Sequence, residues 1–179
     1  VIDDYDKTVI GRGDVPRIYY GFGADLQVGN FSISALFQGN AQADRYLDGI
    51  SIKPFWDDEG RDNVFANITD RWRADNPTNQ DVFYPRLSVG SDGNNNNVKP
   101  SSWWVKDVSF LRLKQVNISY TLPKKWTDPL LIKNAQIYLM GTNLLTFSKF
   151  KLWDPELNTS NGTAYPNVSS YSIGLKFNF

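Results

Sequence analysis

The chain has 179 residues, in which 19 Lys and Arg balance 19 Asp and Glu, and it contains neither Cys nor His. The neutral balance argues against nucleic-acid binding, because proteins that neutralise phosphates carry a basic excess. Without Cys and His, disulfides, imidazole metal ligands and catalysis by an imidazole base are excluded for this chain. A low mean hydropathy of −0.43 is compatible with membrane-spanning strands, in which lipid-facing and lumen-facing residues alternate.

Alternating apolar and polar side chains predict two strands near the start of the chain, over about 17–28 and 31–38. Every second residue from Ile18 to Val28 is apolar or aromatic, and the residues between them are mainly polar or glycine. A period of two is that of a strand with one apolar and one polar face. The pair Gly29-Asn30 lies between the two strands and is typical of a two-residue hairpin turn.

The strand pattern fades between about 39 and 103, where Asp, Asn, Gly and Pro dominate. Loops of this length are uncommon in compact domains, but they occur outside the membrane in barrels. A short helix is expected near 68–74, with Thr69 as its N-cap. The predicted extracellular loops are about 1–16, 39–103 and 148–168.

Three further strands are predicted in the second half of the chain, over about 104–122, 135–147 and 169–179. The first alternates cleanly towards Leu122, and Pro123 ends it because proline lacks the N–H that a strand ladder needs. Its first half is less regular, since two leucines fall on the same face as a glutamine. Both faces of the middle strand carry large side chains, so its orientation stays open.

The last predicted strand carries the clearest alternation. Its apolar face consists of Tyr171, Ile173, Leu175, Phe177 and Phe179, separated by Ser, Gly, Lys and Asn. A patterned edge strand in a soluble protein invites pairing with other chains, whereas a closed barrel pairs it. We therefore expect these five residues to act as a C-terminal signal for barrel assembly.

The strand order predicts the topology of a barrel whose termini lie on the periplasmic side. Counting back from the last strand, the Gly29-Asn30 turn and the link over 123–134 fall inside. The segments 39–103 and 148–168 fall outside, in agreement with the rule of short periplasmic turns and long extracellular loops. Because the smallest barrels need roughly eight strands, the five predicted here imply missing strands before Val1.

The alternation also predicts the environment of individual side chains. The residues expected to face lipid are Ile18, Tyr20, Phe22, Val116, Ile118, Tyr120, Ile173, Leu175 and Phe177. Those expected to face the lumen are Asp25, Gln27, Gln115, Asn117, Ser172 and Lys176.

Five segments carry motifs that go beyond simple alternation. They are Thr8–Gln38, Asp70–Asn79 (DRWRADNPTN), Ser109–Pro123 (SFLRLKQVNISYTLP), Gly141–Glu156 (GTNLLTFSKFKLWDPE) and Tyr165–Phe179 (YPNVSSYSIGLKFNF). In this order they resemble segments of the SusC/RagA family of TonB-dependent transporters, such as "RWTPENPTN", "YLRLKN…LGYTLP" and "GQNLLTFTKY…DPE". The chain departs from the family pattern at Leu152-Trp153 and in the Asn run over 94–97.

This resemblance implies an all-β fold: the C-terminal strands of a large antiparallel transmembrane β-barrel, about five here and not closed alone, with long extracellular loops. Family members are importers in the outer membrane of Gram-negative bacteria. They bind TonB through an N-terminal portion, enclose a plug and pair with a SusD-like surface lipoprotein. Their cargo is usually an oligosaccharide or a peptide, and the resemblance implies no cofactor, metal or enzymatic activity.

Tryptophans in the predicted loops are the candidate ligand contacts, because indole rings stack on sugar faces. They are Trp56, Trp72, Trp103, Trp104 and Trp153. The competing interpretation is that these rings pack the loops or belong to the aromatic girdle of a barrel.

Two groups of acidic residues are candidate sites. Asp57, Asp58, Glu59 and Asp62 could bind calcium through oxygen ligands, but their spacing fits a solvated acidic loop better. Asp154 and Glu156 resemble an acid–base pair, but a loop-fixing role is the stronger interpretation. A secreted β-sandwich that binds carbohydrate is the alternative to the transporter, and a carboxylate-based glycosidase is a more distant one.

Overall fold

Two compact units make up the chain, whose computed structural model describes residues 4–49, 52–55, 64–88 and 95–179. The sheet unit comprises Pro16–Ala43, Val108–Leu157 and Tyr165–Phe179. The loop unit comprises Val1–Val15, Asp44–Asp107 and Asn158–Ala164.

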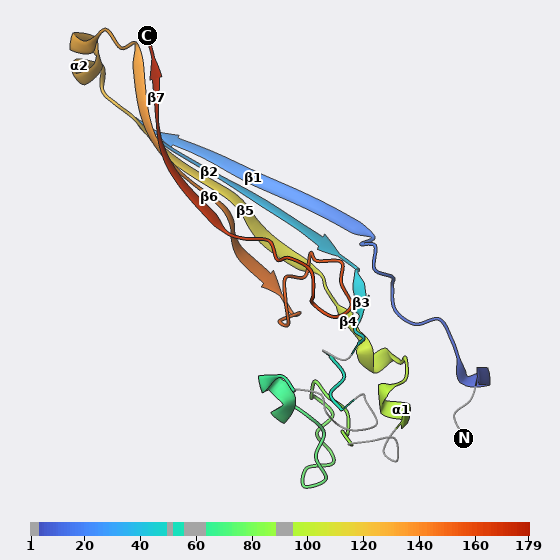
Figure 1. The fold of residues 1–179 in the computed structure, drawn as a ribbon. Coiled ribbons are helices and arrows are strands. Elements are labelled where there is room, and N and C mark those ends of the chain that lie inside the picture. The colour runs from blue at the N-terminus through green and yellow to red at the C-terminus, as the bar shows by residue number, and fades with distance from the viewer. Residues whose placement is uncertain (1–3, 50–51, 56–63, 89–94) are drawn as a thin grey trace. The chain divides into compact units, whose positions relative to one another are not determined.

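Five antiparallel strands form the sheet unit, in the spatial order β1-β2-β5-β6-β7 (Figure 1). The strands are β1 (Ile18–Val28), β2 (Phe31–Ala41), β5 (Phe110–Thr121), β6 (Asn134–Ser148) and β7 (Ser170–Asn178). Each strand pairs with its neighbour along the sheet, and β1 and β7 each have one edge without a partner in the described chain. The expected all-β fold with an open antiparallel sheet is confirmed.

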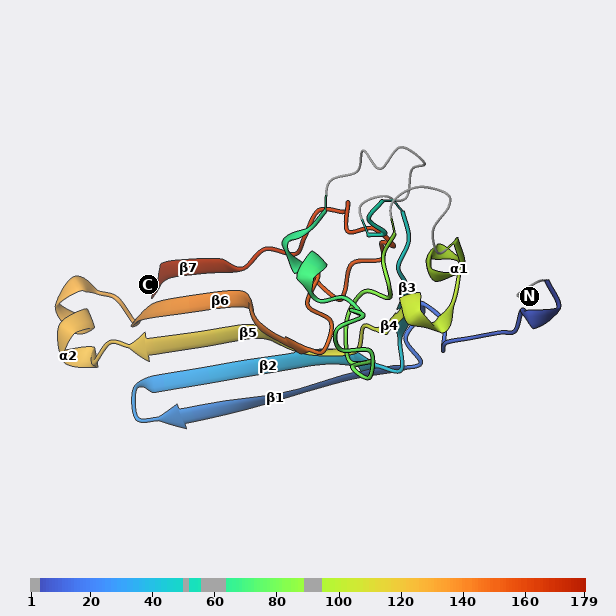
Figure 2. The ribbon, with the colours of Figure 1, turned by 90° about the horizontal axis from the view of Figure 1, so that it is seen from below.

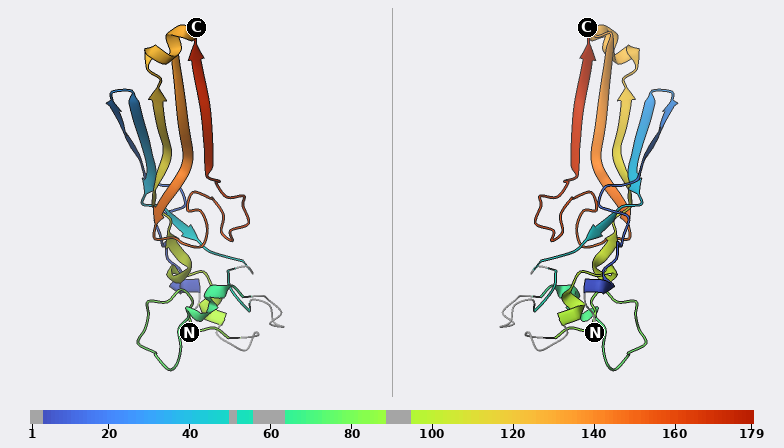
Figure 3. Two further views of the ribbon diagram at one scale, coloured as in Figure 1. Left: turned by 90° about the vertical axis from the view of Figure 1, so that its left-hand side faces the viewer. Right: turned by 90° about the vertical axis from the view of Figure 1, so that its right-hand side faces the viewer.

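Short connections lie at one end of these strands. Gly29 and Asn30 join β1 to β2, with Gly29 at a φ of +57°. The β5–β6 link contains the short helices α2 (Lys124–Thr127) and η4 (Asp128–Leu130). Figure 2 and Figure 3 show the β1–β2 turn and α2 at the same end of the sheet. The long connections, β2 to β5 and β6 to β7, therefore leave from the opposite end.

The strand register divides the sheet into one apolar and one polar face. Directly paired residues lie on the same face, and the pairings align a row through all five strands: Leu26, Ile33, Ile118, Leu139 and Ile173. The next row along consists of Asp25, Ser34, Asn117, Met140 and Ser172, on the opposite face. All residues expected to face lipid share the first face, and all those expected in the lumen share the second.

The same register resolves the orientation of β6. Ile137 and Leu139 pair with Leu175 and Ile173 on the apolar face, whereas Tyr138 and Met140 fall on the polar face. Large side chains on both faces of β6 had left this orientation open in the sequence.

A β-bulge explains the irregular first half of β5. Leu113 pairs with Phe37 of β2, but Gln115 pairs with the next residue, Leu36, so Lys114 is an extra residue in β5. One extra residue reverses the alternation. Leu113 therefore lies on the apolar face and Gln115 on the polar face, although their spacing of two suggested a common face.

Two expectations about secondary structure are corrected. The strand expected over 104–122 is interrupted: Val105–Asp107 forms β4 in a separate two-stranded sheet, and β5 begins only at Phe110. The helix expected near 68–74 is a single 3-10 turn, η2 (Ala66–Thr69), in which Thr69 is the last residue rather than the cap.

The loop unit has little regular structure. Its sheet pairs β3 (Asp44–Tyr46) with β4, and its short helices are η1 (Asp4–Asp6), η2, α1 (Asn95–Val98) and η3 (Ser102–Trp104). Among the described residues of this unit, the buried apolar side chains are Leu47, Ile52, Pro54, Tyr84, Pro85 and Trp104. Hydrogen bonds and ion pairs also join its segments.

Candidate functional site

The β3–β4 pair brings together distant segments of the loop unit. Asp44, Arg45 and Tyr46 of β3 pair with Asp107, Lys106 and Val105 of β4. Beyond β3, the N–H of Asp48 donates to the carbonyl of Ser160, 3.1 Å away. Residues around positions 45, 105 and 160 therefore meet at one place, which simple sequence proximity does not reveal.

Arg12 attaches the first segment of the chain to β3. Its Nη2 lies 2.5 Å from Oδ1 of Asp44 and 2.9 Å from Oδ2 of Asp107, and its backbone N–H donates to Asp44 at 2.6 Å. The flanking Gly11 and Gly13 have φ values of +78° and +93°, which residues with side chains rarely adopt. The hydrogen bond from the Arg12 side chain holds the pKa of Asp44 below its ordinary value. The pair therefore remains charged at neutral pH.

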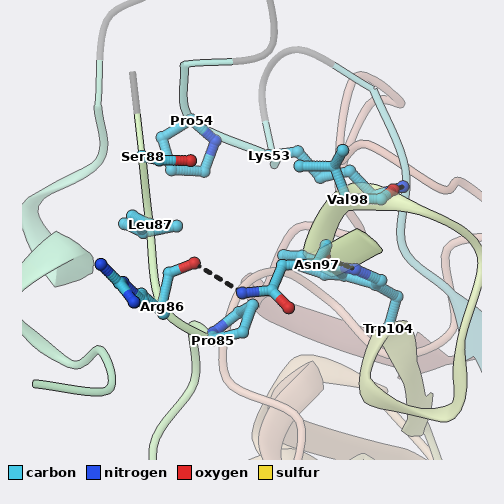
Figure 4. Close-up of a pocket in the computed structure, with 9 residues that line it drawn as sticks. All are labelled: Lys53, Pro54, Pro85, Arg86, Leu87, Ser88, Asn97, Val98 and Trp104. Carbon is cyan, nitrogen blue, oxygen red and sulfur yellow. Dashed lines mark hydrogen bonds between the residues drawn. The ribbon is translucent and has the colours of Figure 1, made fainter. Parts of the chain in front are cut away.

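Lys53 is a second ionic anchor of the loop unit and is buried, with only 1% of its surface exposed. Its Nζ donates to Oδ1 of Asp48 at 2.7 Å, to the carbonyl of Val98 at 2.8 Å and to the hydroxyl of Tyr46 at 3.1 Å. The cavity beside it, shown in Figure 4, measures about 20 Å³ and holds little more than one water molecule. Lys53 therefore has a structural role, and this cavity cannot hold cargo.

Trp104 does not fit the expectation that it contacts a ligand. It is 1% exposed, its Nε1 donates to the carbonyl of Asn97 at 2.9 Å, and its ring packs edge-on against Tyr84. Because both ring faces are covered, Trp104 cannot stack on a sugar while the unit is folded.

The other described tryptophans among the candidate ligand contacts, Trp72, Trp103 and Trp153, are half-buried. Trp72 donates from Nε1 to the carbonyl of Pro77 at 3.1 Å, and Trp103 donates to that of Phe83 at 2.9 Å. In the sheet unit, Trp153 packs edge-on against Phe150. These three keep part of their surface free for a ligand. Trp56 and the acidic residues Asp57, Asp58, Glu59 and Asp62 lie outside the described residues.

Arg112 fixes the loop that follows β6 in the sheet unit. It is 1% exposed and lies on the polar face of β5, paired with Gln38 and Thr146. Its Nη2 lies 2.5 Å from Oδ1 of Asp154, and its Nη1 lies 3.0 Å from Oε2 of Glu156. Both carboxylates are therefore ion-paired to one guanidinium, which supports the loop-fixing interpretation over acid–base catalysis.

An open groove of about 490 Å³ in the loop unit is the most promising binding site. It is lined by Ile10, Gly11, Gly13, Asp14, Asp44, Arg45, Tyr46, Val105, Asn158 and Ser160. Arg45 is 7% exposed, and its Nη1 donates to Oδ1 of Asn158. Burial lowers the pKa of Arg45, and the charge of Asp14 offsets part of this effect.

Sequence analysis missed the arginines and the lysine that organise these sites. Arg12 stands between two glycines, which is a turn signal, but nothing in its neighbourhood points to Asp44, 32 positions away. Arg112 pairs across 42 positions with Asp154. Such pairings depend on the tertiary fold and carry no local period.

Within the described ranges, no three Asp or Glu side chains form a group that could hold a metal ion. No helix in the same ranges is both long enough and apolar enough to cross a membrane.

Known proteins similar to this chain are receptors and importers. No family model matches the chain. TonB-dependent receptor P26 of Formosa agariphila is 32% identical over the whole chain, and TonB-dependent receptor P3 of the same organism is 28% identical over 99% of it. The chain spans 18% of the length of each of these receptors.

Solved structures agree with this similarity. The RagAB peptide importer in its open-open state superposes with a TM-score of 0.72 at 25% identity, over 100% of this chain and 19% of that one. In the closed-closed state the TM-score is 0.76 at 24% identity, over 99% of this chain and 19% of the other.

The unequal burial of the two carboxylates that bind Arg112 generates a prediction. The Asp154 side chain is 13% exposed and that of Glu156 is 36% exposed. Removing one partner of a buried pair costs about 3 kcal/mol or more, whereas an exposed pair contributes about 1 kcal/mol or less. We expect Asp154→Asn to loosen the loop far more than Glu156→Gln.

Tryptic cleavage after Lys149 and Lys151, both exposed in this loop, measures the effect. Where loop opening is rapid, cleavage follows the population of the open form. Asp154→Asn should then accelerate cleavage by about 100-fold, and Glu156→Gln by about fivefold or less. Equal acceleration by both variants would contradict the assignment of Asp154 as the main anchor.

Proposed function

We propose that the whole protein imports a nutrient across an outer membrane. The premise is that this chain belongs to the SusC/RagA-type TonB-dependent receptors and forms a C-terminal portion of their barrel. The observation that carries the proposal is the agreement of sequence and fold over the full chain. A receptor 32% identical covers all of it, and its sheet has one continuous apolar face. The chain is not an enzyme, since its relatives are receptors.

The sheet supports an orientation in the membrane. Short connections at one end and long connections at the other match the periplasmic and extracellular sides of outer-membrane barrels. The apolar face would then face lipid, and the polar face, with Arg112 and the anchored loop, would face the lumen. The loop unit would lie outside the cell, where it could meet cargo and partner.

The partners proposed are those of an energised importer: TonB, which would act through the remainder of the protein, and a SusD-like lipoprotein on the cell surface. The cargo proposed is an oligosaccharide or a peptide. Half-buried tryptophans and an open groove in the loop unit support a ligand of this kind. The solved relative described as a peptide importer adds weight to the peptide alternative.

Growth on defined nutrients tests the import function. A strain that lacks the full-length gene should lose growth on at least one oligosaccharide or oligopeptide source, while growth on the constituent monosaccharides or amino acids remains normal. Loss of TonB should reproduce this defect, and the full-length gene should restore growth. Normal growth of the deletion strain on every source of both classes would contradict the proposal.

The apolar residues of β7 are proposed to guide barrel assembly: Tyr171, Ile173, Leu175, Phe177 and Phe179. β7 pairs with β6 along one edge only within the described chain. In lipid, each unpaired backbone polar group costs several kcal/mol, so β7 needs a second partner before the barrel is stable. An alternating apolar strand with a free edge is a suitable handle for the assembly machinery.

Two neighbouring substitutions test this assembly role in the full-length protein. Phe179→Asp places a charge at the end of the apolar face and should lower the amount of protein in the outer membrane several-fold. Asn178→Asp adds the same charge on the polar face, where Asn178 lies beside Asn134, and should have little effect. Equal outer-membrane levels of both variants would rule out the signal, as measured by quantitative immunoblotting of membrane fractions.

A further inference from the structure

Arg45 is a buried cation whose bonding is incomplete. Its side chain lines the groove of the loop unit, and 7% of the residue is exposed. Its Nη1 donates to Oδ1 of Asn158, which is a neutral acceptor, while its Nε is buried and has no hydrogen-bond partner. In the part of the chain that the structure describes, no carboxylate lies within ion-pair distance of Arg45. A buried, unpaired guanidinium is costly unless another group compensates it.

The other cations that organise the two units differ from Arg45. Lys53 donates to a carboxylate, a carbonyl and a hydroxyl, and Arg112 binds two carboxylates. Arg12 pairs with Asp44 and Asp107. Each of these three has an anionic partner within the chain, whereas Arg45 lies beside an open groove and has none.

We propose that the groove binds a carboxylate group of the cargo at Arg45. Asn158 occupies one terminal nitrogen of the guanidinium. The edge of the guanidinium that carries Nε remains for the ligand. This edge of an arginine offers two parallel N–H donors, which match the two oxygens of a carboxylate. Ile10, Val105 and Tyr46 add apolar surface for the body of the ligand. The inference names a cargo class and in this respect rests on the proposed import function.

The charges around the groove are consistent with this assignment. Asp44, the carboxylate next to Arg45 in sequence, is bonded to Arg12. Asp14 also lines the groove and attracts Arg45 only at a distance, and it is exposed, so solvent screens its field. A ligand carboxylate in direct contact with the guanidinium would outweigh that repulsion. Removing the charge of Asp14 should therefore strengthen binding.

Binding to the full-length protein in detergent tests the proposal without any transport. The probes are short peptides without acidic side chains, each offered as the free acid and as the C-terminal amide. A second arm offers glucose disaccharides that end in glucuronic acid or in glucose. Ligand retained by the protein is quantified by mass spectrometry. The two arms distinguish a peptide terminus from a sugar acid as the source of the carboxylate.

The wild-type protein should retain the acid form at least tenfold better than its neutral counterpart in one of the two arms. Arg45→Met should abolish this preference. Asp14→Asn should increase it, and Arg73→Met should leave it unchanged, because Arg73 is an exposed arginine of the same unit that pairs with nearby Asp75. Equal retention of acid and neutral probes by the wild type in both arms would overturn the proposal, as would a preference that survives Arg45→Met.

Asn158→Asp keeps the test decisive if Arg45→Met fails to fold. It places a carboxylate beside Nη1, so that Arg45 gains an internal partner. If Arg45 has only a structural role, this variant should keep any preference for acids. If Arg45 binds the ligand, the variant should remain folded and lose the preference. These binding measurements do not require import, so they test the site independently of the growth experiment. A deletion strain that grows normally would contradict the import function, whereas a wild-type protein that still prefers acids would leave the Arg45 site supported.

Discussion

A continuous apolar face across five strands is the constraint on which the rest of this structure depends. In the row that crosses the whole sheet, Ile173 is 78% exposed and Leu26 is 61% exposed, and no other described segment pairs with the outer edges of β1 and β7. Soluble proteins rarely leave so large an apolar surface uncovered. A lipid environment resolves this conflict, and it also requires that the sheet edges be paired, since backbone groups in lipid have no water to bind. Membership of a receptor barrel satisfies both requirements.

Outside the strands, buried or partly buried ion pairs hold segments of the chain together. Lys53 and Arg12 join segments of the loop unit, and Arg112 fixes the loop after β6 in the sheet unit. Each is held by at least one carboxylate. The hydrogen bond from Arg12 lowers the pKa of Asp44. Burial alone would raise the pKa of Asp48, but hydrogen bonds from Lys53 and the backbone N–H of Gly49 leave it lowered. Among the described residues, Arg45 differs in having no carboxylate within ion-pair distance, and this contrast is the basis for proposing it as a binding group.

The regular strands could be predicted from the sequence because their period is local. The alternation in β1 and β7 assigned both faces, and the family motifs placed the chain in its barrel. Lys114 shows where this reasoning fails. A bulge is a single extra residue, so it exchanges the two faces of the strand beyond it, and the amino-acid composition of the strand gives no sign of it. The interruption between β4 and β5 and the burial of Trp104 were missed for a different reason. Both depend on pairing with β3 and on packing against Tyr84, and neither partner is near in sequence.

The central claim is that the apolar face meets lipid and the polar face meets water. Spin labels can be introduced one at a time through single cysteines in the full-length protein, reconstituted in bilayers. This chain has no cysteine, and any cysteine outside it is first replaced by serine. Labels at Leu26, Ile118 and Ile173 should collide with apolar oxygen and be shielded from a water-soluble nickel chelate. Labels at their neighbours Asp25, Asn117 and Ser172 should show the opposite preference. Equal accessibility at both sets, or a reversed pattern, would contradict the assignment of the two faces.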